Sequence, residues 1–307
     1  MKRRTFLRSA ALAMGATPFL APRAARAAGG KMDRIGATTV SFRMRFPSTR
    51  PKGAAPAEAD LSLLDVPALF VEKLGISNVE VWSKHFGEAT VGYGGKLRAA
   101  AEKAGARIVN LQMDEPPFDL SSPDAGKRDA CIESTKRWMD IAAACGAPSM
   151  RANVGGAKGE PFDLGTTVDS FRRLAEHGGR IGVKILVENH GGHSMVEGNV
   201  ATIVKAVDSP WCRSLPDFGN MPGEVTMEQR IAFLAPLFPL AELISAKGME
   251  FDGDYRHVSY DIGACVRAAE DAGFRGIYSV ECWAPKYLPP DPFRAVKAVA
   301  DLIRACV

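Results

Sequence analysis

The chain is poor in the residues that build metal–thiolate sites and disulfide frameworks. Its 307 residues include six cysteines and five histidines. The cysteines form no Cys-x-x-Cys pair and do not cluster, since they stand at positions 131, 145, 212, 265, 282 and 306. This spacing excludes a zinc–thiolate or disulfide-stapled fold and predicts free, mostly buried thiols.

A membrane anchor is also missing, because the apolar run near the N-terminus is too short and too broken to span a bilayer. It belongs to an ordered series of basic residues, apolar residues and small residues: Lys2, Arg3, Arg4 and Arg8, then Ala10 to Leu20, then Ala25-Arg26-Ala27. We predict that residues 1–27 are a cleaved secretory signal and that residues 28–307 are the mature, periplasmic domain. The motif "RRTFL" resembles a twin-arginine signal, which exports folded proteins. A disordered basic tail is the alternative.

An excess of positive charge disappears with this segment. Removing residues 1–27 removes six basic residues and no acidic ones, which changes the formal net charge from +4 to −2. A mildly acidic protein has no general attraction to phosphate backbones, so we expect no nucleic-acid partner and a small substrate that is not strongly anionic. Folding in a reducing cytoplasm before export agrees with free cysteines. A homo-oligomer is left open.

What the chain does have is a regular alternation of β-rich and helix-period segments after residue 30. The predicted strands cover residues 34–42, 78–83, 106–113, 148–154, 183–189, 213–218, 242–248 and 276–283. The predicted helices cover residues 65–74, 94–104, 124–145, 167–181, 197–207, 226–236, 259–272 and 291–305. Eight strand–helix units with continuously apolar strands favour an α/β fold of the (β/α)8 TIM-barrel type, as a single domain.

An open doubly wound sheet is the competing fold. It needs a glycine-rich phosphate turn after the first strand, and "TTVSFRMRF" has no glycine. The segment 43–61 interrupts the alternation with a proline- and alanine-rich stretch. It is interpreted either as a lid over the site or as a tolerated surface insertion.

Polar residues stand where several of the apolar strands end, which is where barrels of this type place their chemistry. They are Glu80 and His85 on strand two, Arg151 and Asn153 on strand four, Glu188 and His190 on strand five, Asp217 on strand six, Ser245 and Lys247 on strand seven, and Glu281 on strand eight. Side chains alternate along a strand, so Glu188 and His190 face the barrel mouth together and Asn189 faces away.

Three of these residues are carboxylates at the ends of strands five, six and eight, and a buried carboxylate needs a partner or a cation. The ends of strands five, six and eight converge in a closed barrel, so Glu188, Asp217 and Glu281 can surround a small cavity. Three oxygen donors favour a hard divalent cation, Mg²⁺ or Mn²⁺. Each carboxylate taken alone is also explained by solvation or a salt bridge.

Six motifs give the chain a resemblance to a known family: "GISNVEVWSKHF", "AGARIVNLQMD", "GVKILVENHGG", "LPDFGNMP", "ISAKGMEFDG" and "AGFRGIYSVEC". It resembles the sugar phosphate isomerase/epimerase family of xylose isomerase-like barrels over essentially the whole mature chain. The resemblance implies Glu188, Asp217 and Glu281 as metal ligands and a substrate-binding or supporting role for His190. It implies a further histidine ligand on strand seven, where this chain has Ser245, followed by a retained Lys247. Water or His190 is then the fourth ligand, and metal affinity is reduced or lost.

This resemblance predicts an exported, metal-dependent sugar isomerase or epimerase that acts on a non-phosphorylated keto-sugar through an enediolate. Glu188 and Glu281 are predicted to take and return the proton. Lys247 either polarises a substrate oxygen or forms a salt bridge with Glu281 or Asp217. His190, Glu80, Arg151 and Asn153 are the predicted substrate-binding residues.

Two other functions stay open at this stage. A lyase or hydratase on 3-keto-glycosides needs the same base and the same metal but expels a leaving group after enolisation. A catalytically silent carbohydrate-binding barrel agrees with the missing histidine. A DNA-repair nuclease of the related endonuclease branch is disfavoured, because such enzymes need a histidine-rich site with several metals.

Overall fold

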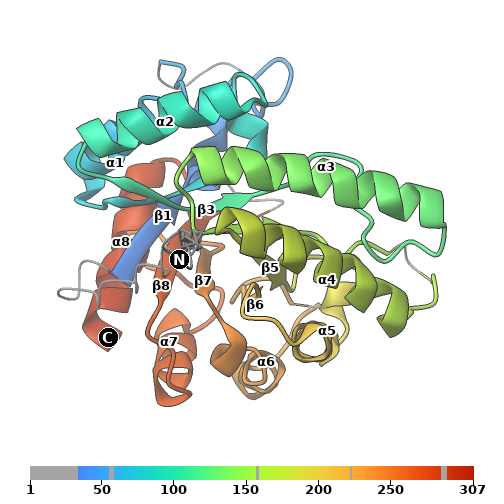
Figure 1. Ribbon diagram of the computed structural model, residues 1–307. Coiled ribbons are helices and arrows are strands. Elements are labelled where there is room, and N and C mark those ends of the chain that lie inside the picture. Colours follow the sequence, from blue (N-terminus) through green and yellow to red (C-terminus); the bar gives the residue numbers. More distant parts are fainter. Residues whose placement is uncertain (1–33, 55–58, 157–158, 222, 285–288) are drawn as a thin grey trace, which may run out of the picture.

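The computed structural model describes residues 34–307 apart from 55–58, 157–158, 222 and 285–288, and strands alternate with helices along this part of the chain (Figure 1). The signal predicted for residues 1–27 lies outside the described residues. The strands are β1 (Ile35–Thr38), β2 (Asn78–Trp82), β3 (Arg107–Gln112), β4 (Ser149–Ala152), β5 (Lys184–Glu188), β6 (Cys212–Leu215), β7 (Leu243–Gly248) and β8 (Ile277–Cys282). The α-helices are α1 (Val66–Leu74), α2 (Val91–Lys103), α3 (Ala125–Ala144), α4 (Leu164–Ile181), α5 (Asn199–Val207), α6 (Met227–Leu234), α7 (Ile262–Asp271) and α8 (Pro292–Cys306).

The strands form one parallel sheet in the order β6-β5-β4-β3-β2-β1-β8-β7. The two ends of this order meet through parallel bridges between Ser214 and Ala241 and between Asp217 and Ser245. The sheet is therefore a nearly closed barrel with the helices around it (Figure 1). The prediction of a (β/α)8 TIM barrel is confirmed.

The interior of the barrel changes character from one end to the other. Leu186, Leu215 and Leu243 form a separate apolar cluster with Val109, and Ile277 packs against it. The register of β7 on β8 then pairs Ser245 with Ser279 and Lys247 with Glu281 further along the strands. Because residues two apart share a side of a strand, these pairs lie above the apolar cluster, toward the carboxyl ends. The sequence thus places charge at the mouth of the barrel and leucine at its base.

Capping residues in the sequence fix where the outer helices begin and end, as α4 illustrates. The Asp163 side chain accepts a hydrogen bond from Thr166 N at the start of α4, and Gly182 ends this helix with a φ of 77°. Such caps satisfy backbone groups that a helix terminus otherwise leaves free. One face of α4, which includes Phe171 and Leu174, is fully buried against the barrel.

The first strand is shorter than its sequence predicts. β1 ends at Thr38, and the 3₁₀ helix η2 (Thr39–Arg45) replaces the second half of the predicted strand 34–42. The Thr38 hydroxyl caps η2 by accepting a hydrogen bond from Val40 N. A threonine whose hydroxyl bonds the backbone N–H two residues further along favours a turn over extended structure. The apolar pattern of residues 34–42 predicts a strand and gives no indication of this turn.

The start of segment 43–61 is tied to the barrel. His85, in the 3₁₀ helix η3 (Ser83–His85), lies with its ring nitrogens 3.0 Å from the hydroxyls of Thr39 and Thr49. Its ring stacks on Phe46 at 3.6 Å between centroids. His85, a strand-end residue in the sequence, therefore anchors this loop.

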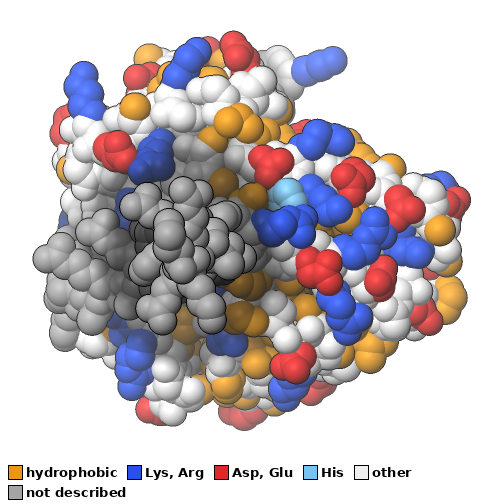
Figure 2. Space-filling model, viewed as in Figure 1, with side chains coloured by type: hydrophobic (Ala, Val, Ile, Leu, Met, Phe, Trp, Pro, Cys, Tyr) orange, Lys and Arg blue, Asp and Glu red, His pale blue; other side chains and the backbone are white. Residues whose placement is uncertain are grey.

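The surface and the cysteines agree with a compact α/β chain. Acidic and basic side chains are mixed over α3 and α4 on the face that Figure 2 shows. Arg173 of α4 pairs with Asp129 of α3 at 2.6 Å. All six cysteines are free, and only Cys306 is not buried. Among the described helices, none is both long and apolar enough to cross a membrane.

Candidate functional site

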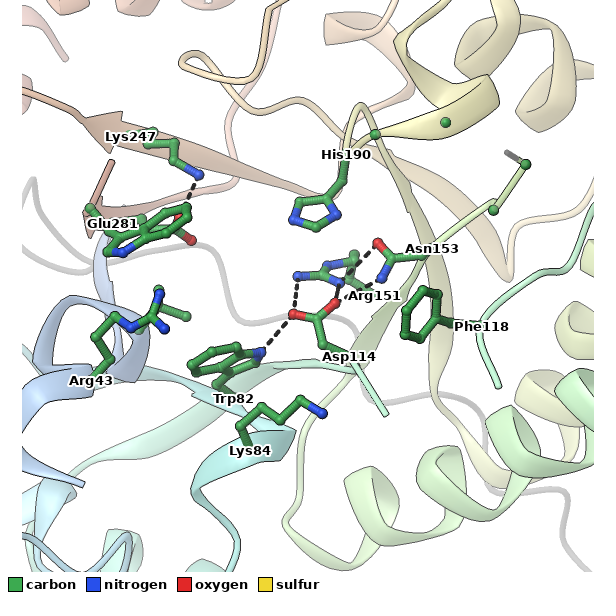
Figure 3. Close-up of a pocket in the computed structure, with 16 residues that line it drawn as sticks. Arg43, Trp82, Lys84, Asp114, Phe118, Arg151, Asn153, His190, Lys247 and Glu281 are labelled. Carbon is green, nitrogen blue, oxygen red and sulfur yellow. Dashed lines mark hydrogen bonds and ion pairs between the residues drawn. The ribbon is translucent and has the colours of Figure 1, made fainter. Parts of the chain in front are cut away.

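A cavity of about 740 Å³ opens at the carboxyl ends of the strands. Its walls come from the segments that follow β1 to β5 and from the ends of β7 and β8 (Figure 3). The lining residues are Val40, Arg43, Trp82, Lys84, Asp114, Phe118, Arg151, Asn153, Gly155, Gly156, His190, Gly191, Gly192, Lys247, Glu281 and Trp283. This is the end of the barrel where sites are expected in this fold.

The structure divides the predicted site residues into two sets. Arg151, Asn153, His190, Lys247 and Glu281 line the cavity. Three predicted carboxylates are nearly or fully buried and are not part of its lining: Glu80, Glu188 and Asp217. The predicted substrate-binding and catalytic residues are therefore only partly in reach of a ligand.

Arg151 organises one side of the cavity. Its Nη1 donates to Asp114 Oδ1 and, at 3.2 and 3.1 Å, to Met113 O and Asn153 Oδ1, while its Nε lies 2.8 Å from Glu188 Oε2. The Nε contact is an ion pair rather than an aligned hydrogen bond, because neither atom has a hydrogen-bond partner. Figure 3 shows Arg151, Asp114 and Asn153 as one group.

Asp114 is the acceptor that completes this group. It also accepts hydrogen bonds from Trp82 Nε1 at 2.6 Å and from Asn153 Nδ2 at 2.8 Å. Burial alone would raise the pKa of Asp114, but the charge and hydrogen bond of Arg151, together with the hydrogen bond of Asn153, hold it well below its usual range. Asp114 is therefore a fixed anion that orients Arg151 and Trp82.

Lys247 organises the opposite side. Its Nζ lies 2.7 Å from Glu281 Oε1 and 4.0 Å from Asp217 Oδ2, and it donates to Asn220 Oδ1 at 3.1 Å. Burial opposes the charged form, but these carboxylates raise the pKa of Lys247 above its ordinary value. Of the two roles predicted for Lys247, the salt bridge is present.

Gly219, in the loop after β6, makes room for this lysine. A Cβ on Gly219 would lie 2.9–3.0 Å from the Lys247 side chain, closer than real Cβ contacts allow. The second glycine of "HGG" has a similar reason, since a Cβ on Gly192 would lie 2.1 Å from Gly155 O. These glycines bring the loops after β4, β5 and β6 close around the site.

Of the three carboxylates predicted to bind a metal, Glu281 is the one that lines the cavity. Its Oε2 accepts a hydrogen bond from Gln112 Nε2 at 3.3 Å, and Gln112 Oε1 in turn accepts from Thr38 Oγ1 at 2.8 Å. Burial alone would raise the pKa of Glu281, but the charge and hydrogen bond of Lys247 outweigh it and lower this pKa. Glu281 is thus an anion at neutral pH.

His190 lies between the Lys247–Glu281 pair and the Arg151 group (Figure 3). Its backbone N donates to Ser194 Oγ at 2.8 Å, and no described residue forms a hydrogen bond with its ring nitrogens. Burial, followed by the positive charge of Arg151, lowers the pKa of His190 to about 4. Its imidazole is therefore neutral at pH 7, with one donor and one acceptor nitrogen.

Glu80 lies deeper, below the cavity. It accepts hydrogen bonds from Asn110 Nδ2 at 2.7 Å and from Ser279 Oγ at 2.5 Å. Burial raises the pKa of Glu80 to about 7. In this structure both carboxyl oxygens are used inside the barrel, so the substrate-binding role predicted for Glu80 has no direct contact with the cavity.

The carboxylates predicted to hold a metal do not form a common ligand set. Within the described part of the chain, no three His, Cys, Asp or Glu side chains are placed to hold one ion. Arg151 lies against Glu188, and Lys247 lies against Glu281 and near Asp217. The donor set therefore does not fit a divalent cation as it is arranged, because the basic side chains of the chain itself lie against the carboxylates.

Several lining residues escaped the sequence analysis. Asp114 lies two residues after β3, Trp82 is the last residue of β2, and Trp283 directly follows β8, so all three stand at or just past the end of a strand. Arg43 comes from η2, and its guanidinium lies 5.7 Å from the Trp82 ring and 5.1 Å from the Trp283 ring. The signal that could have found them is the same strand-end position, applied to the segments after strands one and three and to tryptophan as well as to ionisable residues.

The comparisons with known proteins agree with this fold. The family model described as "Xylose isomerase-like TIM barrel" matches residues 69–306. None of the curated protein sequences compared with the chain matches it.

Solved structures of related shape share low sequence identity with the chain. An L-ribulose 3-epimerase has a TM-score of 0.68 and 14% identity, over 88% of this chain and 93% of that one. The 3-keto-D-glucoside 4-epimerase of E. coli has a TM-score of 0.62 and 15% identity, over 89% and 99%. A xylose isomerase-like TIM barrel protein from Mycobacterium smegmatis, in complex with magnesium, has a TM-score of 0.61 and 15% identity, over 89% and 97%. Because the family model covers most of the described barrel, the chain belongs to the xylose isomerase-like TIM barrel family.

Proposed function

We propose that this barrel isomerises a small, non-phosphorylated sugar by moving a proton between a carbonyl carbon and its hydroxyl-bearing neighbour. The observation that carries the proposal is the Glu281 carboxylate, which faces the cavity while Lys247 Nζ holds it at 2.7 Å. An anionic base beside a fixed cation is what enolisation requires, because negative charge moves from the base to the substrate oxygen.

The cavity has walls that suit a sugar. Trp82, Trp283 and Phe118 present aromatic surface, and Arg43, Asn153 and His190 present polar groups. Aromatic faces pack against the C–H faces of a sugar ring, and a few polar groups fix its hydroxyls. The volume of about 740 Å³ leaves room for a small carbohydrate.

The residues divide the proton transfers between them. Glu281 takes the proton from the carbon beside the carbonyl and returns it to the former carbonyl carbon. The Lys247 ammonium donates a hydrogen bond to the oxygen that becomes negative. Neutral His190 accepts the hydroxyl proton at one nitrogen and donates its own proton to the carbonyl oxygen, so it ends as the other tautomer.

Epimerisation needs a proton delivered to the opposite face of the same carbon. Glu188 is the residue predicted for this second transfer, and it lies behind Arg151, outside the cavity lining. The geometry therefore supports isomerisation with one carboxylate more than epimerisation with two. No step is assigned to a metal, because the donor set does not fit one.

Solvent exchange at carbon tests this proposal directly. The protein is incubated in D₂O with a panel of unphosphorylated ketoses and aldoses, and deuterium entry beside the carbonyl is followed by proton NMR. We expect entry and a new isomer with at least one sugar, and loss of both in Glu281→Gln. Exchange that proceeds equally fast in that variant overturns the role of Glu281.

Export is a separate proposal, and it rests on the sequence alone. We propose that the twin-arginine signal carries the folded protein to the periplasm. Replacing Arg3 and Arg4 by Lys is expected to leave the full-length precursor in the cytoplasm, which immunoblotting of cell fractions detects. Normal processing of this double variant contradicts the route.

A further inference from the structure

The three carboxylates at the ends of β5, β6 and β8 are already faced by cations of the chain. Glu188 Oε2 lies 2.8 Å from Arg151 Nε, and Glu281 Oε1 lies 2.7 Å from Lys247 Nζ. Asp217 Oδ2 lies 4.0 Å from the same ammonium. A buried carboxylate needs such a partner. Lys247 lowers the pKa of Glu281, whereas burial still raises the pKa of Glu188 and of Asp217, so Glu281 is the carboxylate that its cation stabilises most.

Lys247 is fixed where it lies rather than loosely paired. The residue is 4% exposed, and its Nζ also donates to Asn220 Oδ1 at 3.1 Å. Its aliphatic stem packs against Gly219, and its backbone carbonyl accepts a hydrogen bond from the Tyr260 hydroxyl. Both the head and the base of this side chain are held, so the ammonium is a built part of the site.

Ser245, two residues earlier on β7, faces the same place. The resemblance of the sequence implies a histidine ligand here, and the chain supplies a hydroxyl that ligates metals weakly. Ser245 pairs with Asp217 in the bridge that closes the barrel, yet Ser245 Oγ and Asp217 Oδ2 have no hydrogen-bond partner. The ligand is therefore lost at the position where the ammonium approaches the aspartate.

We propose that the Lys247 ammonium takes the place of the divalent cation at the centre of this barrel, so that the wild-type chain works without a bound metal. The exchange depends on Ser245, because the resemblance implies a histidine ligand two residues before the same lysine. Without that ligand, the Lys247 ammonium is the cation that faces Glu281 and Asp217. A divalent ion would have to enter this pocket beside the ammonium with one ligand fewer, and like charges at such distances repel strongly.

The ammonium also offers chemistry that the metal would otherwise provide. It presents three N–H donors, of which Glu281 and Asn220 use two. The remaining donor lies near Asp217 Oδ2 and the Trp283 ring without a further hydrogen bond among the described residues, and it can turn to an oxygen that becomes negative. This last step rests on the proposed function, whereas the replacement of the metal does not.

Titration with MnCl₂ followed by electron paramagnetic resonance tests the replacement in the full chain. Wild-type protein is expected to leave the signal of free Mn²⁺ unchanged. Lys247→Met keeps the stem but removes the charge, and the double variant Ser245→His/Lys247→Met also restores an imidazole. The double variant is expected to bind about one equivalent of Mn²⁺ at the exposed carboxylate set.

Lys184→Met is the matched control, since Lys184 pairs with Glu242 at 2.7 Å at the far end of β5. It is expected to behave as the wild type does toward Mn²⁺. Circular dichroism establishes that each variant is folded, and a rise in Tm with MnCl₂ confined to the variants without Lys247 gives a second readout. This rise follows from binding to the native state only.

Two results overturn the replacement. Stoichiometric Mn²⁺ binding by the wild type that Asp217→Asn abolishes means that metal and ammonium coexist. A folded double variant that binds no Mn²⁺ means that Lys247 does not stand in for an ion. A wild type that binds no metal and enolises no sugar overturns the proposed function and leaves the replacement intact, so the two failures are distinguishable.

Discussion

The two sides of the cavity hold their carboxylates in different ways. On the β3–β5 side, the planar guanidinium of Arg151 is in contact with Met113, Asp114, Asn153 and Glu188. On the β6–β8 side, the Lys247 ammonium is a point charge beside Glu281, with Asp217 Oδ2 and Ser245 Oγ left without hydrogen bonds. A planar guanidinium that is bonded to several acceptors fixes their geometry, whereas an ammonium is a compact charge with three donors, one of which can bond a substrate oxygen. We infer that the β3–β5 side, called here the scaffold side, fixes the geometry of the site. The β6–β8 side, called the chemical side, carries out the proton transfer.

Glu281→Gln is expected to give the largest effect, because it removes the base from the chemical side. Loss of a general base costs typically about 100- to 10,000-fold in rate. The variant keeps an oxygen for Lys247 and should remain folded. The measurement is the rate of deuterium entry beside the substrate carbonyl. A loss smaller than this range would move the base to His190.

Arg151→Met tests the scaffold side through stability. It leaves Asp114 and Glu188 buried without their cation, and breaking a buried pair in this way costs about 3–5 kcal/mol. Denaturant unfolding gives this free energy. Arg173→Met, which breaks the exposed pair with Asp129, is the control and should cost about 0–1 kcal/mol. Equal losses in both variants would show that Arg151 is not a structural centre.

Glu188→Gln separates the two sides by activity. Glu188 lies behind Arg151 and outside the cavity lining, so its loss should slow carbon exchange by less than the roughly 100-fold that an acid–base group contributes. The exchange assay on Glu188→Gln and Glu281→Gln side by side gives the comparison. A matching collapse in both variants would restore the two-carboxylate shuttle that the sequence predicts, and with it epimerisation.

His190 stands between the two sides, and its titration reports on both. Burial and Arg151 lower its pKa to about 4, from an ordinary value near 6.5. A histidine that is harder to protonate when folded makes the unfolded state bind more protons, so stability falls as pH drops from about 6.5 toward about 4. Imidazole NMR, assigned with His190→Gln, should show a neutral ring at pH 6. A midpoint near 6.5 would contradict the placement of His190.

The sequence predicted the barrel well because its signals are local and repeated. These signals are apolar strands, helix caps such as Asp163, and terminal glycines such as Gly182. Each determines the structure of residues that are only a few positions away along the chain. Strand-end placement also brought Arg151, Asn153, His190, Lys247 and Glu281 to one cavity. Each of these needs only the topology and the alternation of side chains.

The partners within the site could not be predicted from the same signals. Nothing local in the sequence says that Arg151 reaches Glu188 or that Lys247 reaches Glu281, since each pair joins different strands. The sequence predicts that three buried carboxylates need a cation. It does not say whether that cation is a metal ion or a basic side chain from another strand, and here Arg151 and Lys247 lie against them. The end of β1 at Thr38 was hidden for a related reason, because a hydroxyl cap competes with an apolar pattern.

The smallest expected effect is on stability, and it comes from two serines that pair with each other, Ser245 on β7 and Ser279 on β8. Ser245 Oγ is buried without a hydrogen bond, whereas Ser279 Oγ donates to Glu80 Oε2 at 2.5 Å. The Ser245 hydroxyl makes no aligned hydrogen bond and only favours the charged form of Asp217. Ser245→Ala should therefore change the free energy of unfolding by less than about 1 kcal/mol. Ser279→Ala takes a donor from a buried carboxyl group and should cost about 1–3 kcal/mol. Urea unfolding of the two alanine variants gives the comparison. A clear loss in Ser245→Ala would mean that its hydroxyl does hold Asp217, and that the chemical side is as tightly bonded as the scaffold side.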